Sequence, residues 1–128
     1  MFLVLKKLMY INIMNKINYP IYYINLERNI DRKNFMEEQF KKLGINNYKR
    51  INAVDGKNIN IPYKIKLTKK IKLNEIGCTL SHLLAIKNAQ NDNCDFAIIC
   101  EDDINFSLLP KWNETIENIV KNAPDDWF

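Results

Sequence analysis

Three acidic residues follow directly on an apolar run in the last third of the sequence. Glu101, Asp102 and Asp103 come after residues 96–100, FAIIC, a short apolar run typical of a central strand buried on both faces. Ligands gather at the carboxyl ends of such strands, and adjacent carboxylates repel one another unless a cation or donor groups neutralise them. The tripeptide alone fits a solvated turn that caps a helix. The buried strand before it favours a site for Mg²⁺ or Mn²⁺, which prefer oxygen ligands and can bridge to phosphates.

Polar residues also follow two other segments that the sequence predicts as strands. Asn25, Arg28 and Arg32 lie at or just beyond the first strand, where guanidinium groups could hold a diphosphate through paired hydrogen bonds. An ordinary helix start with surface charges explains these residues equally well. Asp55 and Gly56 end the second strand. Asp55 could face a ribose or a base there, although a plain turn is the simpler interpretation.

The only histidine, His82, follows Ser81. The pair could suggest nucleophilic catalysis, but no acidic partner lies at an informative spacing, and triads are recognised by geometry rather than by sequence adjacency. From the residues alone, His82 is predicted to be a structural residue of a helix.

The three cysteines, Cys78, Cys94 and Cys100, match neither a disulfide framework nor a zinc site in their spacing. Cys78 lies in a helical pattern and Cys100 in an apolar run, so both are predicted to be small buried side chains. Unpaired thiols fit a reducing compartment, and we therefore predict a cytoplasmic location.

Strand and helix patterns alternate along the chain. Strands are predicted at residues 21–26, 48–54 and 96–100, each followed by a helix. This order predicts an α/β fold with a mostly parallel sheet and helices on both faces.

The helices show apolar residues at helical spacing. The first carries Met36, Phe40 and Leu43 and ends at Gly44. The second is predicted to begin at the N-cap Asn74 and to be buried in the core through an apolar stripe. That stripe comprises Ile76, Leu80, Leu83 and Leu84, widened by Ala85, Ile86 and Ala89. The third is predicted to open near Pro110 and to stop at Pro124, with Trp112, Ile116, Ile119, Val120 and Ala123 on one face.

The 128 residues suffice for one small domain, and an apolar content of 47% excludes a disordered chain. The net charge is +4, and the densest basic stretch, residues 64–72, is predicted to be a solvated face because no nucleic-acid motif accompanies it. No apolar stretch is long enough to span a membrane. Residues 1–18 are predicted to be an N-terminal extension and residues 19–128 the domain.

Four blocks of this sequence resemble glycosyltransferase family 25, which includes bacterial lipooligosaccharide galactosyltransferases and collagen galactosyltransferases. They are IYYINLERNIDR at residues 21–32, INAVDG at 51–56, LNEIGCTLSH at 73–82 and IICEDDI at 98–104. Each block is moderately specific, whereas four in this order with sensible gaps are strongly specific.

The resemblance implies a GT-A-type, Rossmann-like fold, a UDP-sugar donor (most often UDP-galactose) and a divalent metal, usually Mn²⁺. It implies that Asp103, with Glu101 or Asp102, is the counterpart of the family's metal-diphosphate site, and we predict Glu101 and Asp103 as the metal ligands. It also implies that Ser81 and His82 belong to the donor pocket. With the residues singled out above, the predicted donor contacts are Asn25, Arg28, Arg32, Asp55, Ser81, His82 and Asp102.

Members of the family continue into a half that binds the acceptor. The resemblance therefore implies that this chain is the nucleotide-sugar-binding half, that the acceptor half is missing, and that the two could associate. Inverting transfer to a glycan or a hydroxylated acceptor needs a carboxylate base, and no residue of this sequence can be named as that base.

The leading hypothesis is a hexosyltransferase, or half of one. The alternative is a binding module or an inactive remnant that keeps the fold without turnover. A nucleotidyltransferase, which would also use carboxylates and a metal after a strand, is a third hypothesis, and the four-block resemblance speaks against it.

Overall fold

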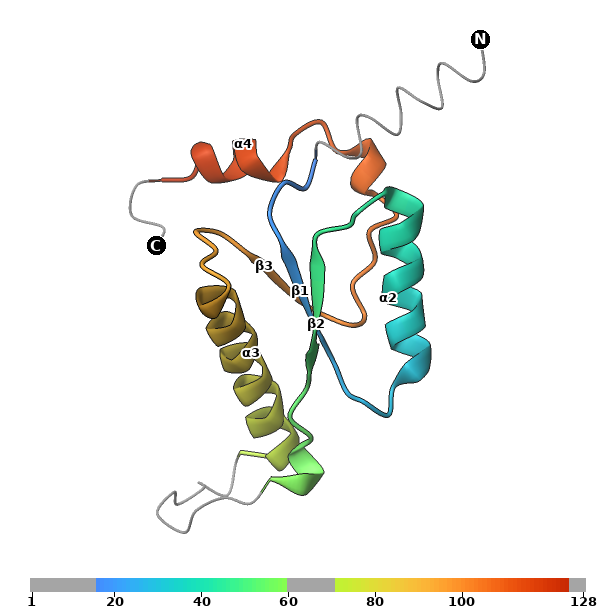
Figure 1. Ribbon diagram of the computed structural model, residues 1–128, viewed down its shortest axis with the longest axis vertical. Helices are drawn as coiled ribbons and strands as arrows, with labels where there is room; N and C mark the ends of the chain where they lie inside the picture. The colour runs from blue at the N-terminus through green and yellow to red at the C-terminus, as the bar shows by residue number, and fades with distance from the viewer. Residues whose placement is uncertain (1–15, 60–70, 125–128) are drawn as a thin grey trace.

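A computed structural model describes residues 16–59 and 71–124. In chain order its elements are β1 (Ile21–Asn25), α2 (Ile30–Leu43), β2 (Tyr48–Asn52), the 3₁₀ turn η1 (Gly56–Asn58), α3 (Leu73–Asn91), β3 (Ile98–Glu101), the 3₁₀ turn η2 (Leu109–Lys111) and α4 (Ile116–Lys121). The three strands form one parallel sheet in the order β2-β1-β3 (Figure 1). The predicted α/β fold with a parallel sheet is therefore confirmed.

The side chains of β1 alternate between two cores. Ile21 and Tyr23 pack with residues of α2, whereas Tyr22 and Ile24 pack with residues of α3. In Figure 1, α2 and α3 accordingly lie on opposite faces of the sheet, as the alternating sequence pattern predicts. Each of the two helices thus covers the apolar side chains on the face of β1 against which it packs.

The central strand is β1 and not the predicted residues 96–100. All five residues of β1 are buried, whereas Ile98 and Ile99 of β3 are only partly buried. The prediction was wrong because β3 pairs, within the described residues, with β1 alone. An apolar run indicates a buried strand but not which strand has neighbours on both sides.

Helix α2 follows its prediction. Met36 and Phe40 have no exposed surface, and Gly44 takes the left-handed conformation, with φ of 67°. Its N–H and that of Ile45 donate to the last carbonyls of the helix, which stops the helix where glycine is favoured.

Helix α3 packs through only part of the predicted stripe, because Ala85 and Ala89 are buried but the larger apolar residues are not. Lys72, rather than Asn74, is the residue at the N-cap. The buried side consists of small residues at a spacing of four, Gly77, Ser81, Ala85 and Ala89. The larger apolar residues of the predicted stripe, such as Leu83 and Ile86, are more than half exposed. Small side chains let the helix lie close to the sheet, so the helix face that carries them is buried, whereas the leucines stay exposed.

Two glycines allow the first turns of α3 to contact the loop after β2. A Cβ added to Gly77 would lie 2.7 Å from the Val54 carbonyl oxygen, and one added to Gly56 would lie 2.5 Å from the Leu73 carbonyl oxygen. Backbone atoms cannot yield as a flexible side chain does, so neither position has room for a side chain.

The last helix is shorter than predicted. Pro110 lies in η2 and Trp112 follows that turn, so α4 covers only Ile116–Lys121. Thr115 is the N-cap and accepts a hydrogen bond from the Asn118 N–H at 3.1 Å, which sets the start of the helix.

Some predictions fall on residues outside the described ranges. These are most of the N-terminal extension, residues 64–70 of the basic stretch, and the chain end at 125–128. Within the described ranges, no helix has both the length and the hydrophobicity that crossing a bilayer requires.

Because of the close contact at Gly77, we expect a glycine-to-alanine substitution in this helix to destabilise the protein. Replacing a helical glycine by alanine normally stabilises a helix, but in Gly77→Ala the new methyl group meets the backbone of Val54 and Gly56. We expect Gly77→Ala to lower the free energy of unfolding by about 1–3 kcal/mol, measured by urea denaturation. The exposed Lys87→Ala in the same helix is the control and should change it by less than about 0.5 kcal/mol. An unchanged or more stable Gly77→Ala protein would contradict the packing described here.

Candidate functional site

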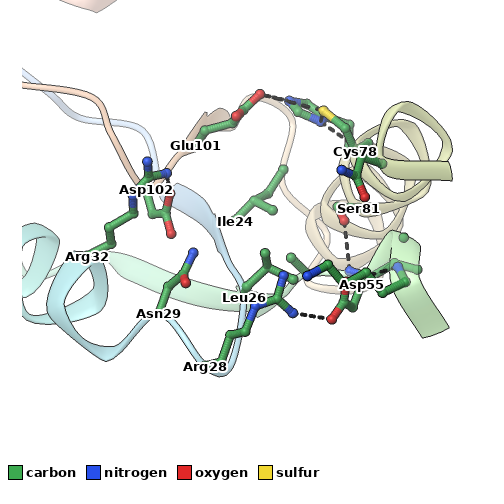
Figure 2. A pocket seen from close by; sticks show the side chains of 16 residues that line it. Ile24, Leu26, Arg28, Asn29, Arg32, Asp55, Cys78, Ser81, Glu101 and Asp102 are labelled. Atoms are coloured by element: carbon green, nitrogen blue, oxygen red, sulfur yellow. Dashed lines mark hydrogen bonds and ion pairs between the residues drawn. The ribbon is translucent and has the colours of Figure 1, made fainter. Parts of the chain in front are cut away.

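A cavity of about 280 Å³ lies at the carboxyl edge of the sheet. Its walls come from the loop after β1, the loop after β2, the end of β3 and one side of α3 (Figure 2). The lining residues are Ile24, Leu26, Arg28, Asn29, Arg32, Ala53, Val54, Asp55, Gly56, Lys57, Asn74, Cys78, Ser81, His82, Glu101 and Asp102. This is the edge at which parallel α/β sheets bind ligands.

The structure gathers most of the residues that the sequence singles out. The predicted residues that line the cavity are Arg28, Arg32, Asp55, Ser81, His82, Glu101 and Asp102. Asn25 does not line the cavity but is buried beside it, bonded to Asp102. Asp103 is exposed and does not line the cavity.

Asn25 joins the ends of all three strands through its side-chain amide. Its Nδ2 donates to Oδ2 of Asp102 at 2.6 Å and to the Asn29 carbonyl at 3.1 Å. Its Oδ1 accepts from Nε of Arg50, on β2, at 2.9 Å. Only 1% of the surface of Asn25 is exposed, so these bonds satisfy an amide that solvent barely reaches.

Asp102 is the acid that turns inward. It is 6% exposed, and its second oxygen accepts from Nη1 of Arg32 at 3.0 Å. The hydrogen bond from Arg32 to Asp102, together with its charge, raises the pKa of Arg32. Asp102 is therefore matched by a cation of this chain, while the guanidinium of Arg32 keeps further N–H donors for an anion in the cavity.

A second ion pair joins the loops after β1 and β2. Nη1 of Arg28 donates to Oδ2 of Asp55, as Figure 2 shows. The other oxygen of Asp55 accepts from the Lys57 backbone N–H at 3.1 Å and caps η1. The Lys57 N–H, and after it Arg28, lower the pKa of Asp55.

Ser81 connects α3 to the loop after β2. Its hydroxyl donates to the Gly77 carbonyl at 2.6 Å and accepts from the Val54 N–H at 2.8 Å. Because its one proton is already donated and its side chain is buried, Ser81 positions the cavity wall and is not free to act as a nucleophile.

The sequence did not indicate a cluster of Cys78, His82 and Glu101 on the α3 side of the cavity. Sγ of Cys78 and Nε2 of His82 lie 3.7 Å and 3.8 Å from Oε1 of Glu101. The prediction that Cys78 is buried was wrong, because the side of α3 that carries it faces the cavity and is exposed. The spacing of four residues between Cys78 and His82 was the available signal, since such residues share one helix face.

Cys100 behaves as predicted. It is 8% exposed and packs in the core with β1 and α2. Burial raises the pKa of its thiol to about 12, so this cysteine is a small apolar core residue and not a reactive group.

The charges that line the cavity balance. Arg28, Arg32 and Lys57 oppose Asp55, Glu101 and Asp102, so three formal positive charges meet three negative ones. An anion that enters therefore adds negative charge that the side chains do not offset, unless a cation enters with it.

The neighbouring acids Asp102 and Asp103 provide a matched pair of variants. The Asp102 carboxylate accepts from two donors on two oxygens, whereas asparagine has one acceptor oxygen and would turn its NH₂ group toward a donor. We expect Asp102→Asn to lower the free energy of unfolding by about 1–3 kcal/mol. The exposed Asp103→Asn should change it by less than about 0.5 kcal/mol. Urea denaturation of both variants checks this, and equal effects would show that Asp102 is not held as described.

The lowered pKa of Asp55 predicts a pH dependence. A carboxyl group whose pKa is lower in the folded state stabilises the fold above its ordinary pKa of 3.8, and this stabilisation is lost as the pH falls through the lowered value. The wild type should therefore exceed Asp55→Asn in stability by a constant amount above about pH 5, and the difference should shrink below pH 3.8. Denaturation series from pH 3 to pH 7 measure it. A difference that grows toward acid pH would contradict the assignment.

Comparison of the sequence with known proteins identifies the family to which the chain is similar. Residues 18–128 match the family described as "Glycosyltransferase family 25 (LPS biosynthesis protein)". The chain is 30% identical over 111 residues to the putative glycosyltransferase R655 of Acanthamoeba polyphaga mimivirus, covering 81% of this chain and 34% of that protein. It is 30% identical over 116 residues to a glycosyltransferase 25 family member of Aedes aegypti, covering 80% of this chain and 19% of that protein.

A further relative is the procollagen galactosyltransferase 1-A of Xenopus laevis, 28% identical over 121 residues, which are 84% of this chain and 20% of that protein. The chain thus spans about a third or less of the length of these relatives. No solved structure matches it. The match covers all three strands and every residue that lines the cavity, and the chain therefore belongs to glycosyltransferase family 25.

Proposed function

We propose that this chain is the donor-binding part of a GT-A hexosyltransferase and that its cavity binds a UDP-sugar, UDP-galactose in particular. The observation that carries the proposal is the convergence of Arg28, Arg32, Asp55 and Glu101 from three separate segments on one cavity at the carboxyl edge of a parallel sheet. Family membership supports glycosyl transfer. The choice of galactose rests on the relative named a procollagen galactosyltransferase.

In this proposal the two arginines hold the diphosphate. Arg28 and Arg32 are each about half exposed, and each uses Nη1 for an acid of this chain. Their remaining N–H groups can donate to phosphate oxygens without breaking those pairs. Asp55, in the loop after β2, would accept a hydrogen bond from a ribose hydroxyl in this proposal.

The donor set also suits a divalent cation that accompanies the diphosphate. The cavity lining has no net formal charge to offset a diphosphate, as shown above. Glu101 and Asp103 are exposed carboxylates, and Asp103 makes no hydrogen bond or ion pair with another described residue. Such oxygen ligands suit Mn²⁺ or Mg²⁺, so we assign these two residues to the metal, which would stabilise the charge of the departing UDP.

Transfer itself requires a bound acceptor. The match to this chain covers only about a third or less of each relative, and we propose that the acceptor site and the catalytic base lie in the part that the relatives have in addition. Holding the acceptor hydroxyl in line with the sugar is worth roughly 7–11 kcal/mol of the barrier. We therefore expect this chain alone to bind the donor but to transfer sugar poorly or not at all.

Calorimetric titration of UDP into the protein tests the proposal. With Mn²⁺ present, UDP should bind and should raise the melting temperature by mass action. Asp103→Asn, which removes a charged ligand, should weaken the Mn²⁺-dependent binding by at least about tenfold. Asp95→Asn is the control, because Asp95 is an exposed acid just before β3, at the opposite edge of the sheet, and it should bind as the wild type does.

Absence of binding at millimolar UDP, with and without Mn²⁺, would contradict the proposal and favour an inactive remnant. Unchanged Mn²⁺-dependent binding by Asp103→Asn would show that the metal ligands are misassigned.

A further inference from the structure

We propose that Cys78, His82 and Glu101 form a site for a thiophilic divalent cation of the Zn²⁺ class on the α3 side of the cavity. The site offers one sulfur, one nitrogen and one oxygen ligand. It shares Glu101 with the metal proposed above but differs from it in its donors and in the cation that it selects. Binding of the bare cation does not depend on UDP.

The three ligand atoms are already close enough to share one ion. They all lie within 4.8 Å of one another, with 3.7 Å between Sγ of Cys78 and Oε1 of Glu101, and 3.8 Å between Nε2 of His82 and the same oxygen. Ligand bonds of about 2.0–2.3 Å at tetrahedral angles place such atoms about 3.4–3.6 Å apart. The two gaps to Oε1 of Glu101 thus exceed those of a tetrahedral site by less than about half an ångström.

The second ring nitrogen of His82 fixes how the imidazole is presented. Nδ1 lies 3.0 Å from the Cys78 carbonyl oxygen, one helical turn earlier. A carbonyl can only accept, so Nδ1 carries the proton and Nε2 keeps its lone pair, directed toward Glu101. Histidines that bind metals are oriented in the same way, by donating their other N–H to a carbonyl or a carboxylate.

The donor set selects the kind of cation. A thiolate is a soft ligand that favours Zn²⁺ over Mg²⁺ or Mn²⁺, and the thiol of Cys78 releases its proton to solvent when the metal binds. Cys78 and Glu101 are exposed and His82 is partly exposed, so an ion from solution reaches all three. Three protein ligands leave a fourth position open toward the cavity, as in zinc sites that bind water or a substrate.

The simpler arrangement is an ion pair between protonated His82 and Glu101 with no metal. It accounts for the 3.8 Å separation of Nε2 and Oε1, and in it the Cys78 thiol donates a hydrogen bond to Oε1 of Glu101 at 3.7 Å, so the sulfur stays protonated. A measurement that reports on the sulfur therefore separates the two arrangements.

Cobalt provides that measurement, because Co²⁺ bound to a thiolate shows a ligand-to-metal charge-transfer absorption. Titrating the 128-residue chain with Co²⁺ in a thiol-free reducing buffer should produce this band at one equivalent, and Zn²⁺ should remove it by displacement. Cys78→Ser should abolish the band, and His82→Gln should weaken Zn²⁺ binding by at least about 10–100-fold. Cys94→Ser, a cysteine that lies outside the cluster, is the matched control and should keep the band.

Thermal unfolding of each variant shows that it is folded before the titration is interpreted. No band in the wild type at millimolar Co²⁺, or a band that survives in folded Cys78→Ser, overturns the site. UDP binding is measured separately in Mg²⁺. If Cys78→Ser loses the cobalt band but still binds UDP, the cation site stands apart from the donor site, and if the wild type gives the band without binding UDP, only the proposed function fails.

Discussion

The buried amide of Asn25 is the interaction on which the carboxyl edge of this sheet depends. It accepts a hydrogen bond from Arg50 of β2 and donates one to Asp102, which follows β3. One side chain on the central strand therefore sets the positions of residues on both neighbouring strands. Because Asp102 is hydrogen-bonded to Asn25 and Arg32, it is buried and has a structural role, whereas the acids on either side of it are exposed. The three adjacent carboxylates therefore divide their roles, and the repulsion expected among them is relieved by the partners of the middle one.

The close packing of α3 provides the second wall of the cavity. Gly77 and Gly56 allow helix and loop backbones to contact, and Ser81 fastens the helix to the same loop through the Val54 N–H. With the small face of α3 against the sheet, the next face around the helix carries Cys78 and His82 to the cavity. The residues that pack against the sheet and those that face the cavity thus lie on adjacent faces of the same stretch of α3, residues 77–82.

The sequence predicts the order of elements well, because periodicity and turn residues such as Gly44 are local signals. It also predicts that the acidic residues come at the carboxyl end of an apolar strand, where Glu101 and Asp102 line the cavity and Asp103 does not. It fails in part on α3, where hydrophobic spacing includes Ala85 but points mainly to the leucines, whereas close packing buries the small residues Gly77, Ser81 and Ala85. It also fails to show that Cys78 and Glu101 meet, because that contact depends on how closely α3 lies to β3, which no local pattern encodes.

Our central claim is that the carboxyl edge is preformed as a donor site in which Asp102 is structural and its neighbours bind metal. A crystal structure of the protein with UDP and Mn²⁺, with the ion located by its anomalous scattering, tests this claim most directly. The predicted result is a peak beside Glu101 and Asp103, with UDP in the cavity against Arg28 and Arg32 and with Asp102 still bonded to Asn25. A manganese ion bound to Asp102, with its bonds to Asn25 and Arg32 broken, or UDP bound elsewhere on the protein, would contradict it.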